Sequence, residues 1–582
     1  MCESTDDCNA AAGEVCDIGM CWGNPPAERF AAVLVPPAGR TDLPVAAAPL
    51  LSITTDGWVS GLDFPEAVAV RGRVILACPP GKGAPPYPCG DAMSVGAQIV
   101  IEGEPRYPGG RPYSRVVSAM PGVGPGQDGF SFLLPRDPNA DYRITIQPDD
   151  SVGGDAFAPG RIAPPRQIAI AADRDRRADW IIGTPGEGKA IRGCVQDILG
   201  MGALYAGMKV TAYGRWTEGG PLERASSRSL TDERGCFDVS VPRKMLHQLD
   251  LSIEPVPGVA LPSFTLRGEI VPDPPDGEEP TVHVIDPPLT MPAAPVPTQF
   301  RLPVQGQRGA GGQEPAVGAT VSFRTTFEPP LANGDRDVEI RFEAEAMTGP
   351  ADSSDAGVAV LDLYPGDLVN RRYLVSVVPP VNSELHSVFE EEIAIGIGGA
   401  EVLEPLALER RTAVTGLVLR GGEPVVNAPI EARPSWLFRK KLDQAALKAA
   451  VEALPDATAT TDADGTFLVW LDRRMVGQSA AYDIDLKPSV YSNAPNWTLE
   501  DIAVPDDGQL GDHELPEASY ARAQVKDQNG EPVRQAEIYI YELPPEASCT
   551  GDAMVDCDAP AKLRGVWGSD DDGWVQLVLP RR

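Results

Sequence analysis

The sequence predicts an all-β protein made of about five tandem β-sandwiches in an extended chain, with one inserted helix. Three observations predict this class. The 582 residues are too many for one hydrophobic core and should divide into four or more domains. The 59 Gly and 60 Pro are plentiful but lack the strict period of collagen. Between the Gly/Pro clusters lie short apolar stretches of strand length, and one sequence phrase recurs five times.

Each copy of this phrase opens with a strand rich in Val and Gly, continues through an A-x-I/V strand, and ends in a D-x-x-G turn followed by an apolar arm. The clearest copy starts at 414–418 (VTGLV), passes through 428–430 (API) and reaches its turn and arm at 461–469 (TDADGTFLV). The last copy follows the same order between 523 and 580. A repeat of this length is a whole domain, and strings of such domains more often hold, space or bind than catalyse.

The positions of the copies predict the domain order. The expected segments are a Cys-rich disulfide module at 1–26, a linker with strands at 27–65, and sandwiches at 66–160, 161–270, 271–395, 396–505 and 506–582. The third copy is the most diverged, and the Pro/Asp-rich stretch at 272–297 is typical of an extended connector.

The fourth copy contains the one convincing helical pattern, at 436–454, with Ser435 as its candidate N-cap. Two interpretations are open for this helix. It caps the open end of its sandwich, or it docks a protein partner, which the basic run at 439–441 favours on an otherwise acidic chain.

The fifth copy ends differently from the others. In the first four copies a further strand follows the apolar arm, whereas the chain stops at 580–582, directly after the fifth arm. The fifth sandwich is therefore expected to lack its closing strand, and an open sheet edge can accept a strand from another chain. Either this C-terminal edge docks onto a protein partner or a neighbouring copy, or the chain's own N-terminal linker covers it.

Cysteine usage predicts an oxidising compartment. The ten cysteines fall into local groups of even number, as a set of disulfides would. The N-terminal spacings of five, seven and four residues fit a zinc site poorly, and three disulfide connectivities remain open there. The cysteines expected in disulfides are Cys2, Cys8, Cys16, Cys21, Cys78, Cys89, Cys194, Cys236, Cys549 and Cys557. We therefore expect an extracytoplasmic protein, at a cell surface, in a periplasm or secreted.

The net charge of −33 is spread through every copy, and a field of this sign repels nucleic acid and anionic membranes. We therefore expect no nucleic-acid partner. The chain has no run of eighteen apolar residues, so no transmembrane segment is expected. The abrupt start at Met1 and Cys2 suggests that a signal sequence was removed or lies outside this chain.

Catalytic and cofactor motifs are missing from the sequence. The four histidines, which are His247, His283, His386 and His513, are at least 36 residues apart and form no zinc motif. Neither G-x-S-x-G nor a P-loop occurs, so we expect no enzyme and no cofactor. Calcium is the one ion left open. Two Asp-rich turns could supply its oxygens, although Asp-Gly is already a sufficient turn signal; their carboxylates belong to Asp462, Asp464, Asp570 and Asp572.

The repeated phrase resembles the carboxypeptidase-regulatory-like, or transthyretin-like, β-sandwich family. Its marks are V-x-G-x-V, then G-x-P-V-x-x-A-x-V/I, then T-D-x-x-G-x-F/Y, and copies four and five show them best. The resemblance implies seven-stranded Greek-key sandwiches of transthyretin or Ig type, which serve as spacer, accessory or adhesion modules of secreted and envelope proteins. The zinc peptidase motif that accompanies such sandwiches in carboxypeptidases is not present here.

The N-terminal cluster resembles a Cys-rich module found behind the signal peptide of large bacterial envelope proteins. The matching pieces are 6–8 (DDC), 13–16 (GEVC) and 19–21 (GMC). This resemblance implies exposure at the cell surface or in the periplasm, and a lipid anchor upstream of this chain.

These observations predict a non-enzymatic exported component with a structural or adhesive role in a bacterial envelope or extracellular assembly. Its expected partners are proteins or copies of itself, through the C-terminal edge or the helix at 436–454. The alternative is a surface lipoprotein that binds glycan or peptide at a cleft between sandwiches. Three tryptophans are the candidates for glycan stacking, namely Trp497, Trp567 and Trp574.

Overall fold

The computed structural model describes most of the chain, and the account below concerns those residues. They are 15–17, 20–22, 29–51, 58–59, 62–77, 93–103, 113–149, 163–183, 188–226, 229–243, 245–272, 282–292, 297–308, 312–366, 370–396, 398, 401–489, 494–543 and 561–581. Strands dominate them, which confirms the all-β prediction. In this part of the chain no helix is long and apolar enough to cross a membrane.

Sandwich 1 takes its strands from residues 67 to 182. They are β6 (Ala67–Gly72), β7 (Val74–Leu76), β8 (Ala97–Gly103), β9 (Tyr113–Ala119), β10 (Phe130–Pro135), β11 (Asp137–Pro148), β12 (Arg166–Ala172), β13 (Arg176–Arg177) and β14 (Trp180–Ile182). One sheet has the order β10-β6-β13, with β7 and β14 paired beside it, and the facing sheet has the order β12-β11-β8-β9. Phe130, Phe132 and Leu134 are all buried, as their alternation along β10 requires.

Sandwiches 2 and 3 share one hydrophobic core. The strands of sandwich 2 are β15 (Gly188–Gln196), β16 (Lys209–Gly214), β17 (Glu223–Arg224), β18 (Ser229–Leu230), β19 (Cys236–Pro242), β20 (Gln248–Glu254), β21 (Ser263–Ile270), β22 (Val282–Val284) and β23 (Leu289–Thr290). Those of sandwich 3 are β24 (Thr298–Arg308), β25 (Gly312–Pro315), β26 (Thr320–Phe327), β27 (Asp337–Met347), β28 (Val358–Leu363), β29 (Arg371–Val378), β30 (Val388–Ile395) and β31 (Leu406–Leu408). The short 3-10 helices η3 (Ala203–Tyr205) and η4 (Leu331–Asn333) lie in their loops. Edge strand β21 pairs antiparallel with edge strand β27, so one sheet of each sandwich joins into a nine-stranded sheet.

Sandwich 4 contains the helical insert. Its elements are β32 (Thr412–Arg420), β33 (Glu423–Pro424), β34 (Pro429–Pro434), α1 (Trp436–Lys440), α2 (Ala445–Glu452), β35 (Ala457–Thr460), β36 (Thr466–Leu471), β37 (Arg474–Met475), β38 (Gln478–Ser479), β39 (Ala481–Leu486), β40 (Trp497–Ala503) and β41 (Gln509–Glu514). The Oγ of Ser435 accepts a 3.0 Å hydrogen bond from the N–H of Phe438, so Ser435 caps α1 as expected. The pattern at 436–454 predicts one helix, but the structure has two, separated by a turn at residues 441–444.

Sandwich 5 combines the two ends of the described chain. Its C-terminal strands are β42 (Glu517–Gln524), β43 (Glu537–Leu543), β44 (Lys562–Gly568) and β45 (Trp574–Arg581). Its N-terminal strands are β3 (Arg29–Val35), β4 (Ala46–Leu51) and β5 (Trp58–Val59). Strand β3 pairs antiparallel with β43, β4 follows on β3, and β5 pairs parallel with β42. The expected linker at 27–65 is therefore part of a sandwich.

All five sandwiches repeat one pairing pattern. The opening strand pairs antiparallel with the apolar arm and parallel with a short last strand, as β32 does with β36 and β41. The middle strand pairs with a closing strand, as β34 does with β39. The closing strand pairs on its other side with one further strand, as β39 does with β40. In sandwich 5 the last three positions of this pattern belong to β3, β4 and β5. The N-terminal strands therefore replace the strands that the fifth repeat lacks.

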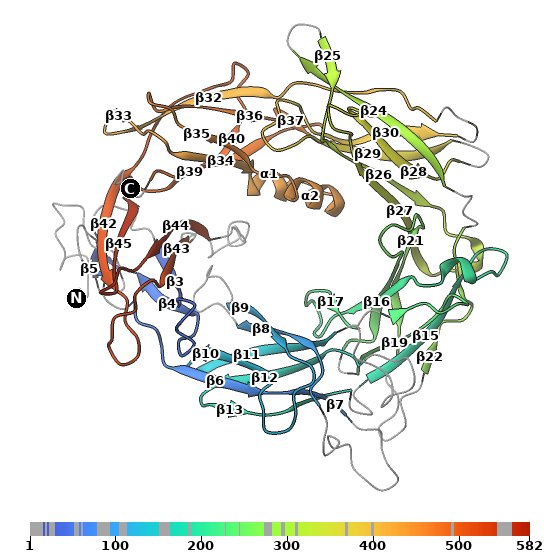
Figure 1. Ribbon diagram of the computed structural model, residues 1–582, viewed down its shortest axis with the longest axis horizontal. Coiled ribbons are helices and arrows are strands. Elements are labelled where there is room, and N and C mark those ends of the chain that lie inside the picture. The colour runs from blue at the N-terminus through green and yellow to red at the C-terminus, as the bar shows by residue number, and fades with distance from the viewer. Residues whose placement is uncertain are drawn as a thin grey trace.

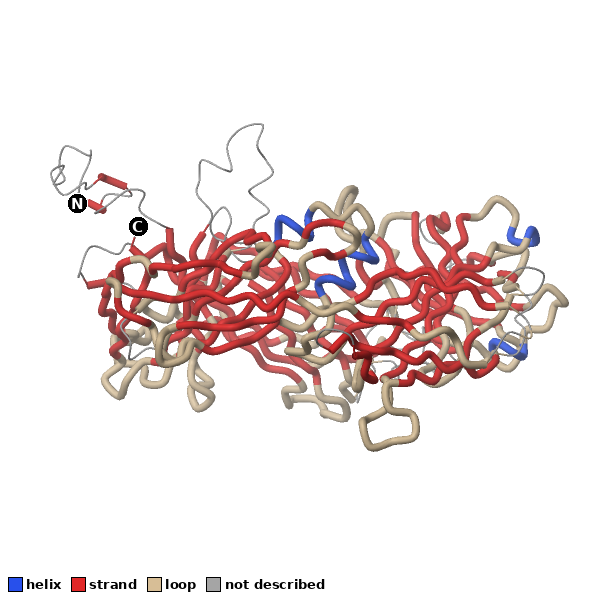
Figure 2. Tube along the Cα trace, turned by 90° about the horizontal axis from the view of Figure 1, so that it is seen from above, coloured by secondary structure: helices blue, strands red, loops and turns tan. Residues whose placement is uncertain are grey.

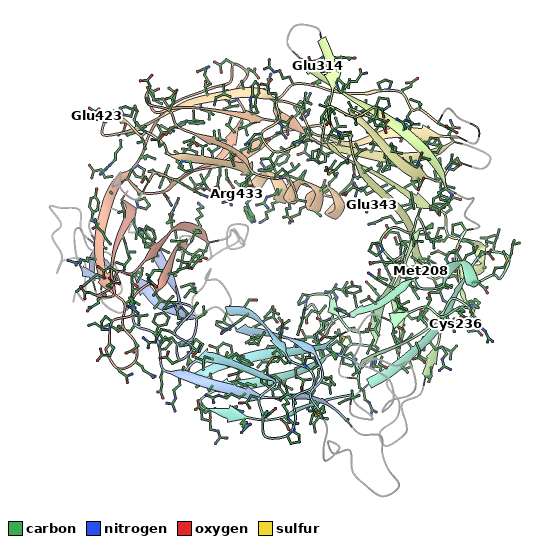
Figure 3. All side chains as sticks on the ribbon, in the orientation of Figure 1. Met208, Cys236, Glu314, Glu343, Glu423 and Arg433 are labelled. Atoms are coloured by element: carbon green, nitrogen blue, oxygen red, sulfur yellow. A yellow bond between two sulfur atoms is a disulfide. The ribbon has the colours of Figure 1, made fainter. Side chains whose placement is uncertain are left out.

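This replacement closes the chain into a ring, where an extended string of domains was expected. Figure 1 shows the five sandwiches following one another around the ring, and the edge-on view in Figure 2 shows a flat body. One sheet of each sandwich faces outward and the other faces the middle of the ring. Figure 3 accordingly places Glu314 and Glu423 on the outer side, and Glu343 and Arg433 on the inner side.

The sheet pairing also extends sandwiches 1 to 4 beyond the predicted boundaries at 160, 270, 395 and 505. The strands that lie past those boundaries are β12 to β14 in sandwich 1, β22 and β23 in sandwich 2, β31 in sandwich 3 and β41 in sandwich 4. Part of the stretch expected as a connector at 272–297 consequently forms strands. Apart from β12 and β41, these strands have two or three residues each, which is too few for an alternation to show in the sequence.

Candidate functional site

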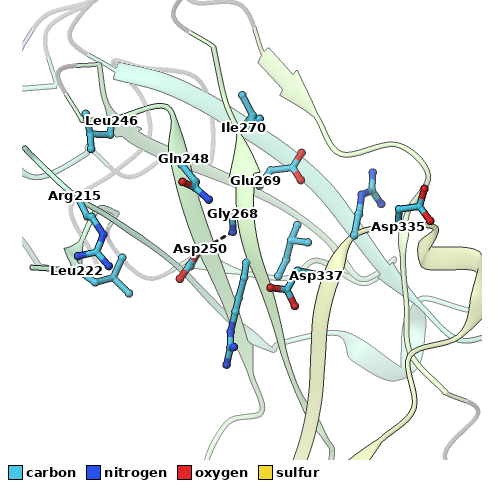
Figure 4. Close-up of a pocket in the computed structure, with 13 residues that line it drawn as sticks. Arg215, Leu222, Leu246, Gln248, Asp250, Gly268, Glu269, Ile270, Asp335 and Asp337 are labelled. Atoms are coloured by element: carbon cyan, nitrogen blue, oxygen red, sulfur yellow. Dashed lines mark hydrogen bonds between the residues drawn. The ribbon is translucent and has the colours of Figure 1, made fainter. Parts of the chain in front are cut away.

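A groove of about 770 Å³ crosses the junction between sandwiches 2 and 3 (Figure 4). It lies over β20, β21 and the start of β27, and the loop between β16 and β17 adds Arg215 and Leu222. Three apolar side chains in its lining are solvent-exposed, namely Leu222, Leu246 and Ile270, at 47%, 36% and 69%. The groove is of the size that binds small molecules or short segments of chain.

A β-bulge shapes this groove. The register of β20 against β21 shifts between Leu249 and Leu251. Opposite the shift, Gly268 has a φ of +67°, and its N–H donates a 2.8 Å hydrogen bond to Oδ1 of Asp250. A Cβ at Gly268 would also lie 2.8 Å from the side-chain nitrogen of Gln248. Because this backbone angle favours glycine, Gly268 suits the bulge, which bends the sheet here.

Every guanidinium group in the groove donates to an oxygen of the protein itself. The pairs are Arg215 with the carbonyl of Gly220, Arg267 with the carboxylate of Glu339, and Arg336 with the carbonyls of Asp286 at 2.8 Å and Pro287 at 2.7 Å.

Two carboxylates of the groove have no partner among the described residues. The side chains of Asp335 and Asp337 are exposed in the groove, and within the described ranges their carboxylates accept no hydrogen bond and form no ion pair. The other acids are engaged, since Asp250 accepts from the backbone and Glu269 lies 2.8 Å from Nε2 of His283. With four carboxylates and three guanidinium groups in its lining, the first groove carries a net negative charge.

A second groove of about 400 Å³ continues along the same sheet face and shares Arg267 with the first. Its lining includes the hydroxyl groups of Ser252, Ser263 and Thr265. Across both grooves the lining has seven acidic side chains and four arginines. Glu343, which Figure 3 places on the inner side of the ring, is one of these acids.

Buried polar contacts fix the junction near the grooves. The hydroxyl group of Tyr364 in sandwich 3 donates a 2.5 Å hydrogen bond to the carbonyl of Ala260 in sandwich 2. Burial raises the pKa of Tyr364 to about 12, so its hydroxyl group stays protonated and able to donate. The side chain of Asn333 bonds both backbone groups of Thr290, at 2.8 and 2.9 Å. The two halves of the groove are therefore held in one arrangement.

The two Asp-rich turns show the geometry of hairpin turns. Oδ1 of Asp462 accepts from the N–H groups of Asp464 and Thr466, and Oδ1 of Asp570 accepts from those of Asp572 and Trp574. The hydroxyl group and N–H of Thr466 lower the pKa of Asp462. In the described part of the chain no three His, Cys, Asp or Glu residues gather closely enough to hold a metal ion. Calcium binding at these turns remains a prediction without structural support.

The predicted pairing of Cys194 with Cys236 is present as a disulfide. The two residues are direct partners on β15 and β19 of sandwich 2. Cys16 and Cys21 are partners in the backbone register of the short hairpin formed by β1 (Val15–Asp17) and β2 (Met20–Trp22). The other six predicted positions lie outside the described residues, and they are Cys2, Cys8, Cys78, Cys89, Cys549 and Cys557.

His247 and His283 lie in sandwich 2, His386 in sandwich 3 and His513 in sandwich 4. His386 contacts the buried carboxylate of Asp472 at 2.5 Å, and Nε of Arg411 donates to the same oxygen at 3.0 Å. Asp472 is 1% exposed and belongs to sandwich 4, whereas His386 comes from sandwich 3. This cluster therefore joins two sandwiches.

The helical insert packs on its own sandwich. Phe438, Leu442 and Val451 belong to the core of sandwich 4, and Leu447 is also buried, as the capping interpretation expects. In the basic run, Arg439 lies 3.5 Å from Glu452, and the ammonium group of Lys440 lies 4.6 Å from the centre of the Trp436 ring.

The candidate glycan-stacking tryptophans are partly covered by the protein itself. Guanidinium groups lie over two of the rings, that of Arg564 over Trp497 at 5.0 Å and that of Arg522 over Trp574 at 4.5 Å. Trp567 packs against the core of sandwich 5. None of the three lines the grooves between sandwiches 2 and 3.

Comparison with known proteins identifies no family. No family model matches the chain, and no curated protein matches it. Among solved structures, the TIE protein of Bacillus anthracis is 10% identical, with 76% of this chain and 73% of that chain covered and a TM-score of 0.16. A streptococcal ancillary pilin is 12% identical over 60% of this chain and 99% of that chain, with a TM-score of 0.19. Two B repeat units of the collagen-binding protein of Staphylococcus aureus are 12% identical over 77% of this chain and 100% of theirs, with a TM-score of 0.13. These scores are too low for a shared arrangement of the chain, so no function follows from them.

Proposed function

We propose that this chain is a non-enzymatic structural component exported by a bacterium, and that it works as a rigid ring of β-sandwiches. The observation that carries the proposal is the completion of sandwich 5 by β3, β4 and β5. A chain that pairs its ends in this way fixes the positions of all its domains relative to one another, as a spacer or scaffold requires. The resemblance to carboxypeptidase-regulatory-like sandwiches supports the same kind of role and remains a prediction.

The junctions between neighbouring sandwiches support a rigid ring. Sandwiches 2 and 3 share a sheet and a core, and the Asp472 cluster joins sandwiches 3 and 4. Between sandwiches 4 and 5, Arg420 donates a 2.7 Å hydrogen bond to the hydroxyl group of Tyr520. At the same junction Arg564, which is 1% exposed, donates to Thr498 at 3.2 Å. Buried polar contacts such as these specify one geometry because each broken partner leaves an unsatisfied group.

The disulfide of sandwich 2 supports export, because disulfides persist mainly outside the cytosol. An envelope location and a lipid anchor are parts of the proposal that rest on the sequence resemblance alone.

The test is to purify the tagged chain from its native envelope under mild conditions and to identify its companions by mass spectrometry. A partner, or further copies of the chain, in a fixed ratio is the expected result. A lone monomer in every fraction would contradict a structural role in an assembly.

The groove between sandwiches 2 and 3 favours a second candidate function, which is ligand binding at a cleft between sandwiches.

A further inference from the structure

We propose that the groove between sandwiches 2 and 3 binds an extended peptide segment that presents a lysine side chain. The inference goes beyond the structural role of the ring, and its failure would leave the closure of sandwich 5 untouched. Three features of the groove carry it, which are its uncompensated charge, its exposed apolar lining and its length.

The charge selects a cation. The three arginines of the first groove already donate to oxygens of the protein, whereas the carboxylates of Asp335 and Asp337 have no partner in the described part of the chain. The lining of the first groove has four carboxylates against three guanidinium groups, so its net charge repels an anion. An ammonium group would gain the two unpartnered carboxylates without breaking a hydrogen bond. The net charge of −33 adds a field of the same sign, which raises the local concentration of cations.

The apolar lining selects a cation on a long stem. Leu222, Leu246 and Ile270 are exposed in the same groove as the two free carboxylates. The four methylene groups of lysine pack along apolar surface while its ammonium group reaches a polar or charged one. A small inorganic cation would gain nothing from the three apolar side chains. The combination therefore fits an aliphatic amine better than a bare ion.

The length of the site selects a chain over a single amine. The second groove continues from the first at Arg267 and has the hydroxyl groups of Ser252, Ser263 and Thr265 in its lining. The hydroxyl groups of Ser252 and Ser263 already donate to Glu254 at 2.9 Å and to the carbonyl of Arg341 at 3.0 Å, but their oxygens can still accept from the N–H groups of a peptide backbone. Strands β21 and β27 are paired with each other beneath this face. The peptide is therefore held by side chains on the sheet face and adds no strand to an edge.

The experiment measures fluorescence anisotropy of a fluorescein-labelled, capped hexapeptide of alternating Ala and Lys, with the full chain as titrant. We expect saturable binding that weakens with salt, and no saturable binding of the matched Ala/Glu peptide. The double variant Asp335→Asn/Asp337→Asn should weaken the affinity about tenfold, as for the loss of two partly exposed ion pairs. Ile270→Ser should weaken it by about threefold through lost apolar contact. Circular dichroism confirms that each variant is folded.

The matched control is Asp352→Asn, which removes one exposed charge from sandwich 3 outside both grooves. This variant should bind the peptide as the parent chain does. Equal weakening by Asp352→Asn, or unchanged binding by the double variant, would show a diffuse charge effect and overturn the site. Spermidine serves as a competitor that has amines but no peptide backbone. If spermidine displaced the labelled peptide at a concentration equal to that of the peptide, the amine alone would be recognised, and the assignment to a peptide would be overturned.

Discussion

Ala32 and Ile540, from opposite ends of the chain, lie directly opposite each other on the paired strands β3 and β43. Both side chains are buried in the core of sandwich 5, at 1% and 0% exposure. This core contains residues of β3 to β5 and of β42, β43 and β45, so neither end of the chain can form it alone. The tether through sandwiches 1 to 4 keeps the two ends at a high effective concentration, which favours pairing within one molecule.

The core residues of β3 should stabilise sandwich 5 strongly. Leu34 is 0% exposed within that core, so Leu34→Ala should destabilise the sandwich by about 2–5 kcal/mol through lost contacts and a cavity. Val33, on the other face of the same strand and only partly buried, is the matched control, and Val33→Ala should cost less than about 1 kcal/mol. Amide hydrogen exchange of residues 537–543 measures both effects. Equal protection in the two variants would contradict the role of β3.

An ion pair across the closure makes its stability depend on pH. Nη2 of Arg40, in the loop after β3, lies 2.9 Å from Oδ2 of Asp527, in the loop after β42. Burial works to raise the pKa of Asp527, but the hydrogen bond from Arg40 and two from backbone N–H groups hold it below 3.8. Because the folded pKa lies below the unfolded one, the charged carboxylate stabilises the fold above about pH 4. That contribution is lost as the pH falls through the lowered pKa.

Asp527→Asn tests this linkage, since the Oδ1 of asparagine can still accept from the backbone of the turn. The variant should lose about 1 kcal/mol at pH 7, a figure reduced because the side chain of Arg40 is 31% exposed. The difference from the parent chain should shrink as the pH falls through the lowered pKa of Asp527 and the parent carboxylate becomes protonated. Asp571→Asn, at an exposed turn position of the same sandwich, should show neither effect. A loss that persists at low pH would contradict the ion pair.

The buried carboxylate of Asp472 should make Arg411 important for the junction of sandwiches 3 and 4. Arg411→Met leaves this carboxylate with one cationic partner fewer and should cost about 3 kcal/mol. The neighbouring Arg410 pairs with Glu384 at a solvent-exposed position, so Arg410→Met should cost less than about 1 kcal/mol. Limited proteolysis near residues 396–412 reports the opening of the junction. Similar cleavage rates for the two variants would show that the cluster does not hold the sandwiches together.

The disulfide of sandwich 2 closes a loop with a sequence separation of 42 residues. Replacing both cysteines by alanine should destabilise this sandwich by about 2–4 kcal/mol, chiefly by freeing the unfolded chain. Hydrogen exchange in β15 and β19 measures the loss, and β32 and β36 of sandwich 4 serve as the internal control. Unchanged protection in β15 would mean that the shared core with sandwich 3 alone sets the local stability.

The repeated phrase was sufficient to predict the all-β class, the opening strands and the apolar arms, because these strands are long and alternate regularly. Phe130, Phe132 and Leu134 show this well. The last strand of each sandwich could not be predicted in the same way. Strands β5 and β13 have two residues each, which is too short for any period to appear.

The closure of sandwich 5 and the groove between sandwiches 2 and 3 could not be predicted from the sequence for a different reason. Both depend on pairing between segments that are distant in the sequence, β3 with β43 and β21 with β27. No local pattern encodes such a partner. Asp335 and Asp337 lie in the stretch NGDRD, which has the composition of an ordinary turn, and only the neighbouring sandwich makes that turn part of a groove. For the edge of sandwich 5 the sequence left two alternatives, and the pairing of β3 and β5 corresponds to cover by the chain's own N-terminal segment.

The most direct test of the closed ring is a cross-link between Val33 and Tyr539, which are direct partners on β3 and β43. The double variant Val33→Cys/Tyr539→Cys is oxidised, digested without reduction and analysed by mass spectrometry for the linked peptides. The closed ring predicts this link in monomeric protein, and no link when the two single variants are mixed and oxidised together. A link between mixed single variants, in dimers, would mean that β3 completes the sandwich of a neighbouring copy. The absence of any link in the double variant would contradict the closure itself.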